Sequence, residues 1–416
     1  MRRRLAEADY PLVILALVLS VFGVATVYSA GQTDVSTSLA GLWRMQALHL
    51  ALGLGAAWVV SRASVRALDY LTPVVYGAAL LVLALLPVIG RGAGTAKSTH
   101  SWLYIGDVSV GQPSELAKIA VVIMLAKVLA SRSDAPRTLG DLWRPAVVVG
   151  VPWVLIMLQP DLGTGLVFVG IFFAMLYWAG TRWQLLVMAA SPVVSLVLAF
   201  NTPLWGAWFV FIILLLYRTR PLLAESVAVV AANLVFGVVA PYVWDHLQPH
   251  QQKRLLVFLD PSSDPLRSGY HVLQSQVAIG SGGWLGKGFT QGSQKRLAFL
   301  PEQTTDFIFP VVGEELGFVG VVAVLALYAW LMMRCIRIAA RSQNPFASLV
   351  AFGLVAMLFA HVLENVGMTI GVMPITGIPL PFFSYGGSFM LACWIAIGLL
   401  VRLSLEGRGQ ADTLVI

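Results

Sequence analysis

Charged residues are scarce in this sequence, at 11% of its 416 residues, whereas apolar residues make up 58%. A soluble domain carries about 25% charged residues, so this composition excludes a soluble protein and also a disordered chain. A net charge of +7 on so few charged residues also excludes an ordinary nucleic-acid-binding protein. Cysteine is almost absent, and Cys335 and Cys393 alone exclude a disulfide scaffold and a Cys-ligated zinc or iron–sulfur site. What remains is a polytopic helical membrane protein.

Long apolar runs recur along the whole chain. Because about 20 apolar residues cross the hydrocarbon core of a bilayer as a helix, each run predicts one span. Two shorter apolar stretches, 183–200 and 203–217, predict an extra transmembrane hairpin. The sequence therefore predicts an all-α, single integral membrane domain over residues 1–416 with about 12 transmembrane helices, or ten if neither short stretch crosses. The ten clear spans lie near residues 11–30, 45–61, 68–89, 113–131, 145–158, 163–180, 222–243, 307–333, 346–366 and 384–402.

The basic residues give the expected orientation, because Lys and Arg are enriched in cytoplasmic loops. With the N-terminus inside and every span crossing, 17 of the 27 basic residues lie on the inner side. This distribution predicts that both termini are cytoplasmic. No internal repeat is visible, so the sequence gives no support to a transporter built from inverted repeats.

Residues 244–306 form an outer connection that is too long to serve only as a loop, and connections of this length usually carry function. Six basic residues lie in it, on the side where few are expected. Long loops escape the orientation rule, so simple tolerance and an anionic partner at the outer leaflet are both open possibilities. These residues are Lys253, Arg254, Arg267, Lys287, Lys295 and Arg296.

The stretch 367–388 is also outer, and it is apolar but interrupted by Pro374, Pro379 and Pro381. Irregular backbone at membrane depth is tolerated only where it is buried in protein or lines a cavity. We therefore expect a re-entrant segment that walls a pocket open to the outer side.

Ionisable side chains inside spans cost about 3 kcal/mol or more each at the bilayer centre, so they indicate function by default. Here they gather near the outer ends of their spans, which favours an outward-facing site over a transport path through the membrane. Glu115 and Lys118 share one helix face, so a structural ion pair between them is the alternative. The set comprises Glu115, Lys118, Asp161, Asp306, Glu314, Glu315, His361 and Glu364.

Several motifs, taken in order, resemble those of the SEDS family (shape, elongation, division and sporulation) of bacterial peptidoglycan glycosyltransferases. Within the family the chain resembles the elongation type (RodA) more than the division type (FtsW), on residues 280–283 and 291–294. Two features depart from the family pattern: members typically have ten spans, and Thr304 replaces a usual His. The motifs are SWLYIG (101–106), QPSELAK (112–118), QPDLGT (159–164), GYHVLQSQ (269–276), GSGG (280–283), GKG (286–288), LPEQTTDFIF (300–309), EELG (314–317), NVG (365–367) and PLPFFSYGGS (379–388).

The resemblance implies an inverting glycosyltransferase that polymerises lipid II, a disaccharide-pentapeptide on undecaprenyl pyrophosphate, at the outer face of the bacterial cytoplasmic membrane. It places Asp306 as the general base that activates the acceptor hydroxyl. No metal-binding residue and no cofactor is assigned with certainty, but a divalent cation, Mg²⁺ or Mn²⁺, stays open as cofactor, and Asp161 is a candidate polar wall or cation ligand. The residues expected to bind substrate are Trp102, Glu115, Lys118, Asp161, Arg254, Lys287, Arg296 and Ser384.

The resemblance also implies a partner, a class B penicillin-binding transpeptidase, besides the surrounding membrane lipids. Two other functions stay open at this point. Many spans with a polar cavity also suit a lipid II flippase, although the outer position of the ionisable groups argues against it. The third interpretation is a non-catalytic scaffold of the cell-wall machinery.

Overall fold

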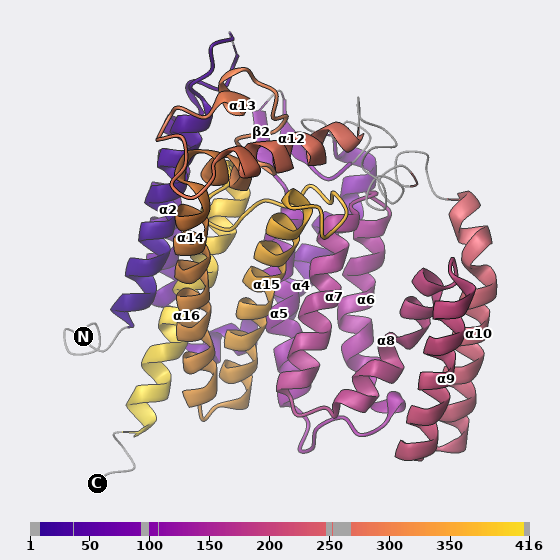
Figure 1. The fold of residues 1–416 in the computed structure, drawn as a ribbon. Coiled ribbons are helices and arrows are strands. Elements are labelled where there is room, and N and C mark those ends of the chain that lie inside the picture. The colour runs from indigo at the N-terminus through magenta and orange to yellow at the C-terminus, as the bar shows by residue number, and fades with distance from the viewer. Residues whose placement is uncertain are drawn as a thin grey trace.

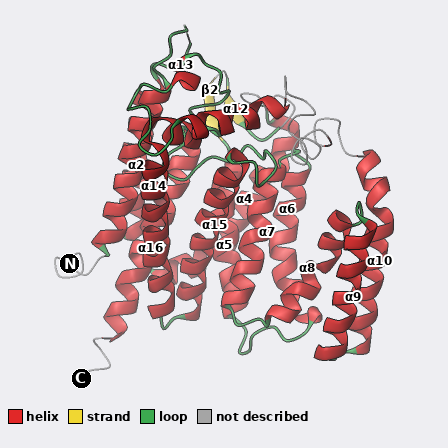
Figure 2. Cartoon of the chain, viewed as in Figure 1, coloured by secondary structure: helices red, strands yellow, loops and turns green. Residues whose placement is uncertain are grey.

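The computed structural model describes residues 9–411 apart from 36, 93–99, 107, 247–251 and 253–267, and its described part is almost entirely helical (Figures 1 and 2). Successive long helices run in alternate directions along one axis (Figure 1). They are α2 (Tyr10–Ala30), α3 (Leu42–Ser61), α4 (Val65–Ile89), α5 (Pro113–Ala130), α6 (Trp143–Met157), α7 (Leu162–Trp178), α8 (Trp183–Leu198), α9 (Thr202–Thr219), α10 (Leu223–His246), α14 (Ile308–Arg341), α15 (Pro345–Thr369) and α16 (Gly387–Ala411).

Short elements cover one end of the bundle, which we call the α12 end (Figure 1). Both described ends of the chain lie at or toward the opposite end. At the α12 end the hairpin β1–β2 is antiparallel, and residues 268–306, which are most of the described part of the long connection, lie across the helix ends. The short elements are β1 (Leu103–Ile105), β2 (Val108–Gly111), α12 (Ser268–Ser281) and α13 (Ser293–Arg296), with η1 (Leu139–Leu142) before α6.

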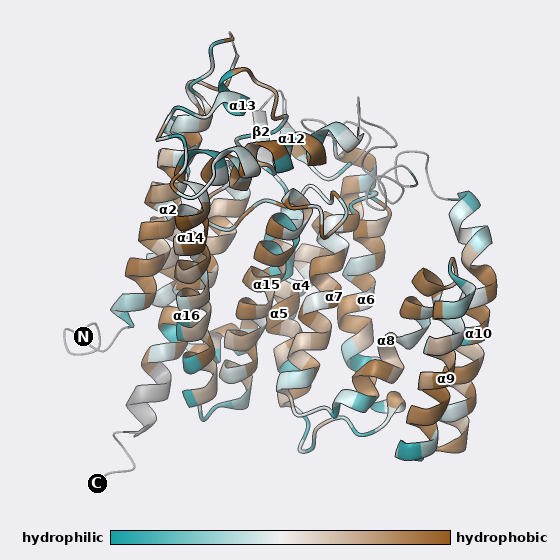
Figure 3. Ribbon diagram, in the orientation of Figure 1, coloured by the Kyte–Doolittle hydropathy of each residue, from teal (hydrophilic) through white to brown (hydrophobic). Residues whose placement is uncertain are grey.

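The long helices confirm a multi-pass membrane protein. Among the described residues, eight helices are long and apolar enough to cross a membrane, and α7 and α8 are shorter apolar helices. Figure 3 shows largely hydrophobic flanks, with hydrophilic residues gathered toward the two ends. Apolar side chains on the flanks suit lipid, which has no water to hydrate polar groups. The number of crossings stays a prediction.

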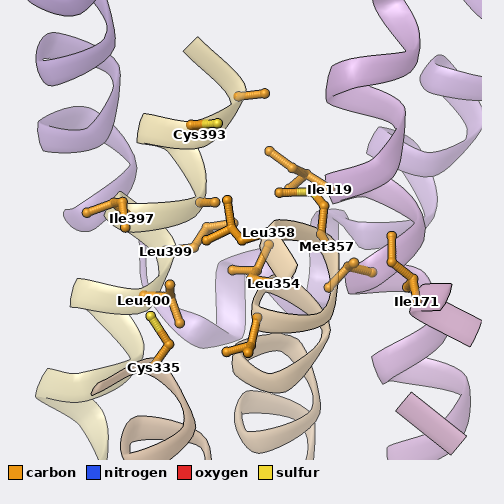
Figure 4. Packing of buried hydrophobic residues seen from close by; sticks show 14 of the residues in the cluster. Ile119, Ile171, Cys335, Leu354, Met357, Leu358, Cys393, Ile397, Leu399 and Leu400 are labelled. Carbon is orange, nitrogen blue, oxygen red and sulfur yellow. The ribbon is translucent and has the colours of Figure 1, made fainter. Parts of the chain in front are cut away.

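The core of the molecule is centred on α15, which is buried around most of its circumference. A helix that is apolar on all sides is expected inside a bundle rather than at its surface. Figure 4 shows side chains of α5, α7, α14 and α16 meeting those of α15, among them Met357 and Leu358. Helices α2–α7 and α14–α16 supply most of this core, and we call them the main bundle; Leu185 of α8 also packs into it.

Helices α8, α9 and α10 form a second, smaller group, the side bundle, at one edge of the main bundle (Figure 1). Their apolar core is separate from the main one and includes Met188, Ile212 and Val229. The predicted hairpin 183–217 corresponds to α8 and α9, which pack against each other and against α10. Its crossing of the membrane stays a prediction.

The helix α14 is broken near the α12 end. Gly317 has φ 64° and ψ −164°, a backbone conformation outside the helical region that glycine adopts without a Cβ penalty. The break frees two carbonyl groups, and the backbone N–H groups of Lys287 and Gly288 donate to Glu314 O and Glu315 O at 3.0 Å each. The turn before α13 thereby fixes the first part of α14.

The segment between α15 and α16 has no regular structure from residue 372 to 386, as the three prolines predict. Its backbone is nevertheless packed inside protein: Leu380, Phe382 and Phe383 are buried in the main core, and the Tyr328 hydroxyl donates to Pro381 O. This is the arrangement that irregular backbone requires at membrane depth.

Candidate functional site

Asp306 lies in a tight turn at the α12 end, immediately before the first turn of α14. The turn closes on itself, because the N–H groups of Thr305 and Phe307 both donate to Glu302 O at 3.1 Å. The side chain of Asp306 is partly exposed, and its Oδ2 lies 3.4 Å from the position that a Cβ on Gly377 would occupy. A carboxylate near a helix N-terminus interacts favourably with the helix dipole, and a carboxylate is a candidate general base.

Lys118 is the centre of a buried polar cluster between α5 and α15. Its ammonium lies 2.8 Å from Glu115 Oε2 and 2.7 Å from His361 Nε2, and the side chain of Lys118 is 0% exposed. His361 Nδ1 lies 3.2 Å from Pro379 O. A carbonyl only accepts, so Nδ1 carries the ring proton and Nε2 accepts from Lys118.

The same cluster extends toward Asp161 and Glu364. Glu364 is buried one helical turn after His361, on the same face of α15. Asp161 caps α7, accepting from the backbone N–H of Thr164 at 3.1 Å, and also accepts from Gln112 Nε2 at 2.8 Å. The structure therefore brings together Glu115, Lys118 and Asp161, as the sequence predicts.

Trp102 lies beside this region rather than in a helix. It pairs with Arg91 through two backbone hydrogen bonds of 2.9 and 3.1 Å, directly before the hairpin β1–β2, and its side chain is partly exposed. The hairpin leads into α5, which carries Glu115 and Lys118. An aromatic side chain here is available at the rim of the α12 end.

Ser384 is buried in the segment between α15 and α16. Its hydroxyl donates to Thr305 O at 2.6 Å and accepts from the Leu380 N–H at 2.7 Å. The residue therefore joins the re-entrant segment to the turn that carries Asp306. Its predicted contact with substrate stays a prediction.

The predicted basic residues of the long connection lie in different surroundings. Lys287 Nζ is 2.8 Å from Glu314 Oε1, and Arg296 pairs with Asp34 at 2.8 Å. The pKa of Arg296 is raised by this hydrogen bond to Asp34. Arg254 lies outside the described residues. Contact of these residues with a pyrophosphate stays a prediction.

Lys295 has a position that the sequence did not single out for the site. It is 0% exposed, and its ammonium donates to Ser29 O at 2.6 Å and pairs with Glu315 Oε1 at 2.7 Å. Burial lowers the pKa of Lys295, and the nearby Glu315 partly offsets this. Its neighbours Lys287 and Arg296 have the same charge, so composition alone could not separate a buried lysine from exposed ones.

The protein groups that could hold a metal are few. Among the described residues no group of three or more His, Cys, Asp or Glu side chains is arranged to hold a metal ion. Mg²⁺ is often bound by one or two carboxylates together with substrate phosphates, so such a cation does not require a cluster made of protein groups alone.

Comparison with known proteins shows which family this chain matches. The profile of the FtsW/RodA/SpoVE family, described as cell cycle proteins, matches residues 10–218 and 205–409. The two matched stretches overlap within α9, which belongs to the predicted extra hairpin. The chain is 34% identical over 397 residues to the peptidoglycan glycosyltransferase MrdB of Escherichia coli K12, covering 95% of this chain and 93% of the relative. It is also 34% identical over 438 residues to the peptidoglycan glycosyltransferase RodA of Treponema pallidum, covering 97% and 98%.

Solved structures show the same fold. A chain of a peptidoglycan synthase complex that coordinates polymerization and crosslinking is similar with a TM-score of 0.70 and 31% identity, over 96% of this chain and 98% of that chain. The rod shape determining protein RodA of Thermus thermophilus is similar with a TM-score of 0.61 and 27% identity, over 95% and 96%.

Proposed function

This chain belongs to the FtsW/RodA/SpoVE family of cell cycle proteins, also known as the SEDS family, and from that membership we propose how it polymerises its substrate. It is a peptidoglycan glycosyltransferase of the RodA type, acting in cell elongation and shape. Its substrate in this proposal is lipid II, and its product is a glycan strand that stays attached to a lipid pyrophosphate.

The observation that carries the mechanism is the position of Asp306. Its carboxylate is partly exposed in a turn fixed against the re-entrant segment, at the end of the main bundle where a polar sugar can approach. Asp306 accepts the proton of the acceptor hydroxyl as that oxygen attacks the anomeric carbon of the donor sugar. The glycosidic bond to the lipid pyrophosphate breaks, and the pyrophosphate leaves with the bonding electrons. Attack from the opposite side inverts the anomeric centre.

The leaving pyrophosphate requires positive charge where its own charge develops. Lys118 supplies a cation in the same half of the molecule, and its pairing with Glu115 and His361 fixes its position. Lys287 and Arg296 contribute positive charge at the α12 end, and both are partly exposed while paired. In this proposal Lys118 acts on the pyrophosphate and Trp102 contacts a sugar or the peptide.

A divalent cation, Mg²⁺ or Mn²⁺, is also proposed, held mainly by the pyrophosphate of the substrate and by few protein oxygens. When bound, it neutralises charge on the leaving group. No step assigned to Asp306 or Lys118 depends on this cation.

We place the α12 end outside the bacterial cytoplasmic membrane and both termini inside. The basic residues support this orientation, because those near the opposite end of the bundle include Arg62, Lys127, Arg182 and Arg334. A class B penicillin-binding transpeptidase is the proposed partner, which crosslinks the glycan. The similarity to a chain of a complex that coordinates polymerization and crosslinking supports this partner.

The decisive experiment compares the purified protein with its Asp306→Asn variant on labelled lipid II. We expect the variant to lose about 10²–10⁴-fold in polymerisation rate, the usual contribution of a general base. Equal polymer from both proteins would remove Asp306 from this role. Proteoliposomes carrying lipid II separate the alternatives, because translocation without polymer indicates a flippase, and neither activity indicates a scaffold.

A further inference from the structure

Three consecutive backbone carbonyl groups of the turn that carries Asp306 are each held by a donor from the other side of the site. Thr304 O accepts from the Tyr385 N–H at 2.8 Å, and Thr305 O accepts from the Ser384 hydroxyl at 2.6 Å. Asp306 O accepts from Asn365 Nδ2 at 2.9 Å. A turn with no regular hydrogen-bonding partner must satisfy its buried carbonyl groups in this way.

Asn365 is the member of this set that reaches Asp306 itself. The same Nδ2 also donates to Ile378 O at 2.7 Å, so one amide group joins the backbone of Asp306 to the backbone of the re-entrant segment. Asn365 is 0% exposed and projects from α15, the most buried helix of the main bundle. An amide offers two N–H donors at a fixed angle, which suits it to bridge two carbonyl groups.

The backbone of residues 377–378, which faces Asp306, is also held in place. Gly377 has φ +72°, and its neighbour Ile378 is the second residue held by Asn365. The carboxylate of Asp306 therefore lies next to a stretch of backbone whose position is set by the same side chain that sets its own. Loss of the Asn365 amide removes both fixed points at once.

We propose that Asn365 is a positioning residue for the glycosyl transfer: it fixes the backbone of Asp306 relative to residues 377–378, so that the carboxylate meets the acceptor hydroxyl. The inference rests on the proposed role of Asp306 as base. Asn365 does not touch the substrate in this proposal. Its effect is therefore on turnover and not on lipid II binding, because a displacement of about 1 Å in a reacting group can cost roughly 100-fold in rate.

The test uses the full-length protein and two substitutions at this position. Asn365→Ala removes the amide, and Asn365→Asp keeps the shape but replaces the donors with acceptors that face the same carbonyl groups. The matched control is Asn233→Ala, because Asn233 is also 0% exposed and also joins two elements, α10 and α8, far from the site. Labelled lipid II gives kcat and KM, thermal unfolding gives stability, and lipid II affinity is measured in the Asp306→Asn background.

We expect both Asn365 variants to lower kcat by about 10- to 100-fold, with KM and lipid II affinity within about twofold of the parent values. Asn233→Ala should lower the unfolding temperature to a similar degree and leave kcat within about twofold. The inference is overturned if Asn365→Ala retains the kcat of the Asn233→Ala control, or if its loss lies in lipid II affinity.

The two proposals fail in different ways. If Asp306→Asn polymerises as well as the parent, the assignment of the base is wrong whatever Asn365 does. If Asp306→Asn is inactive while Asn365→Ala is normal, only the positioning role is wrong. Should Asn365→Ala not fold, Asn365→Asp carries the same test, and an unchanged kcat in that variant overturns the inference.

Discussion

The side bundle and the main bundle both bury polar side chains, but they satisfy them by different means. In the side bundle, Asn233 bonds to Ser191 at 2.7 Å and to Ser195 at 2.8 Å, a neutral set that is closed within α8 and α10. The main bundle also buries charges, among them Lys118, which is paired with Glu115, and Glu315, which is paired with Lys295 of α13. Burial of a charge costs far more free energy than burial of an amide. The largest desolvation costs therefore fall in the bundle where the chemistry is expected.

A substitution of Lys118 gives the strongest test of this difference between the two bundles. Lys118→Met leaves Glu115 as a buried charge without its cation, and breaking a buried pair in this way costs about 3–5 kcal/mol. Asn233→Ala removes neutral hydrogen bonds and should cost about 1–3 kcal/mol. Denaturant unfolding in detergent micelles measures both values.

The double variant Glu115→Gln, Lys118→Met sharpens this prediction. It should recover part of the stability, because Glu115 is no longer left as a charge without its cation, but it should stay impaired in lipid II polymerisation. If Lys118→Met costs no more than Asn233→Ala, the two bundles do not differ in the way proposed.

Two glycines give a second test of the difference. Gly377→Ala places a methyl group 3.4 Å from Asp306 Oδ2 at a positive φ, which costs about 1–2 kcal/mol and should lower polymerisation. Gly206 lies in α9 of the side bundle, and a Cβ there meets nothing within 4 Å. Gly206→Ala should therefore be neutral or stabilise by up to about 1 kcal/mol, with normal activity. Equal behaviour of the two variants in unfolding and lipid II assays would contradict this.

The smallest expected effect is a pH dependence of stability. Burial lowers the pKa of Lys295 from its ordinary value of 10.5, so the folded protein binds fewer protons than the unfolded chain between the two pKa values. The parent should therefore gain stability relative to Lys295→Met as pH rises toward 10.5. The difference between the parent and Asn233→Ala should stay flat over the same range, because an amide does not titrate. Unfolding midpoints against pH measure both, and a flat Lys295 difference would refute the prediction.

The sequence predicted the membrane fold well, because apolar runs of this length are rare outside helices that cross a bilayer. It also predicted that the ionisable groups gather at one end, and Glu115 and Lys118 are indeed paired there. The motif at 159–164 placed Asp161 in this region correctly. The role of Asp161 as an N-cap became visible only when the structure showed that α7 begins at Leu162.

Contacts between residues far apart in the chain could not be predicted from the sequence. The bond from Asn365 to Asp306 and the bond from Ser384 to Thr305 depend on how the irregular segment folds back, and periodicity says nothing about a segment without a period. Lys295 likewise looks like any surface lysine until α2 is placed beside it. The clue available in advance was the motif NVG (365–367), which begins at Asn365 directly after Glu364.

The final turn of α2 has a consequence for how the protein is made. Its carbonyl groups at Ser29 and Ala30 accept from Lys295 and Gln303, which follow 266 and 273 residues later. The first membrane helix therefore leaves the ribosome long before its own end can be completed. The Ser29 carbonyl group also accepts locally from the Gln32 N–H at 2.9 Å, but its contact with Lys295 can form only after the long connection has been made, so the helix synthesised first makes some of its contacts late.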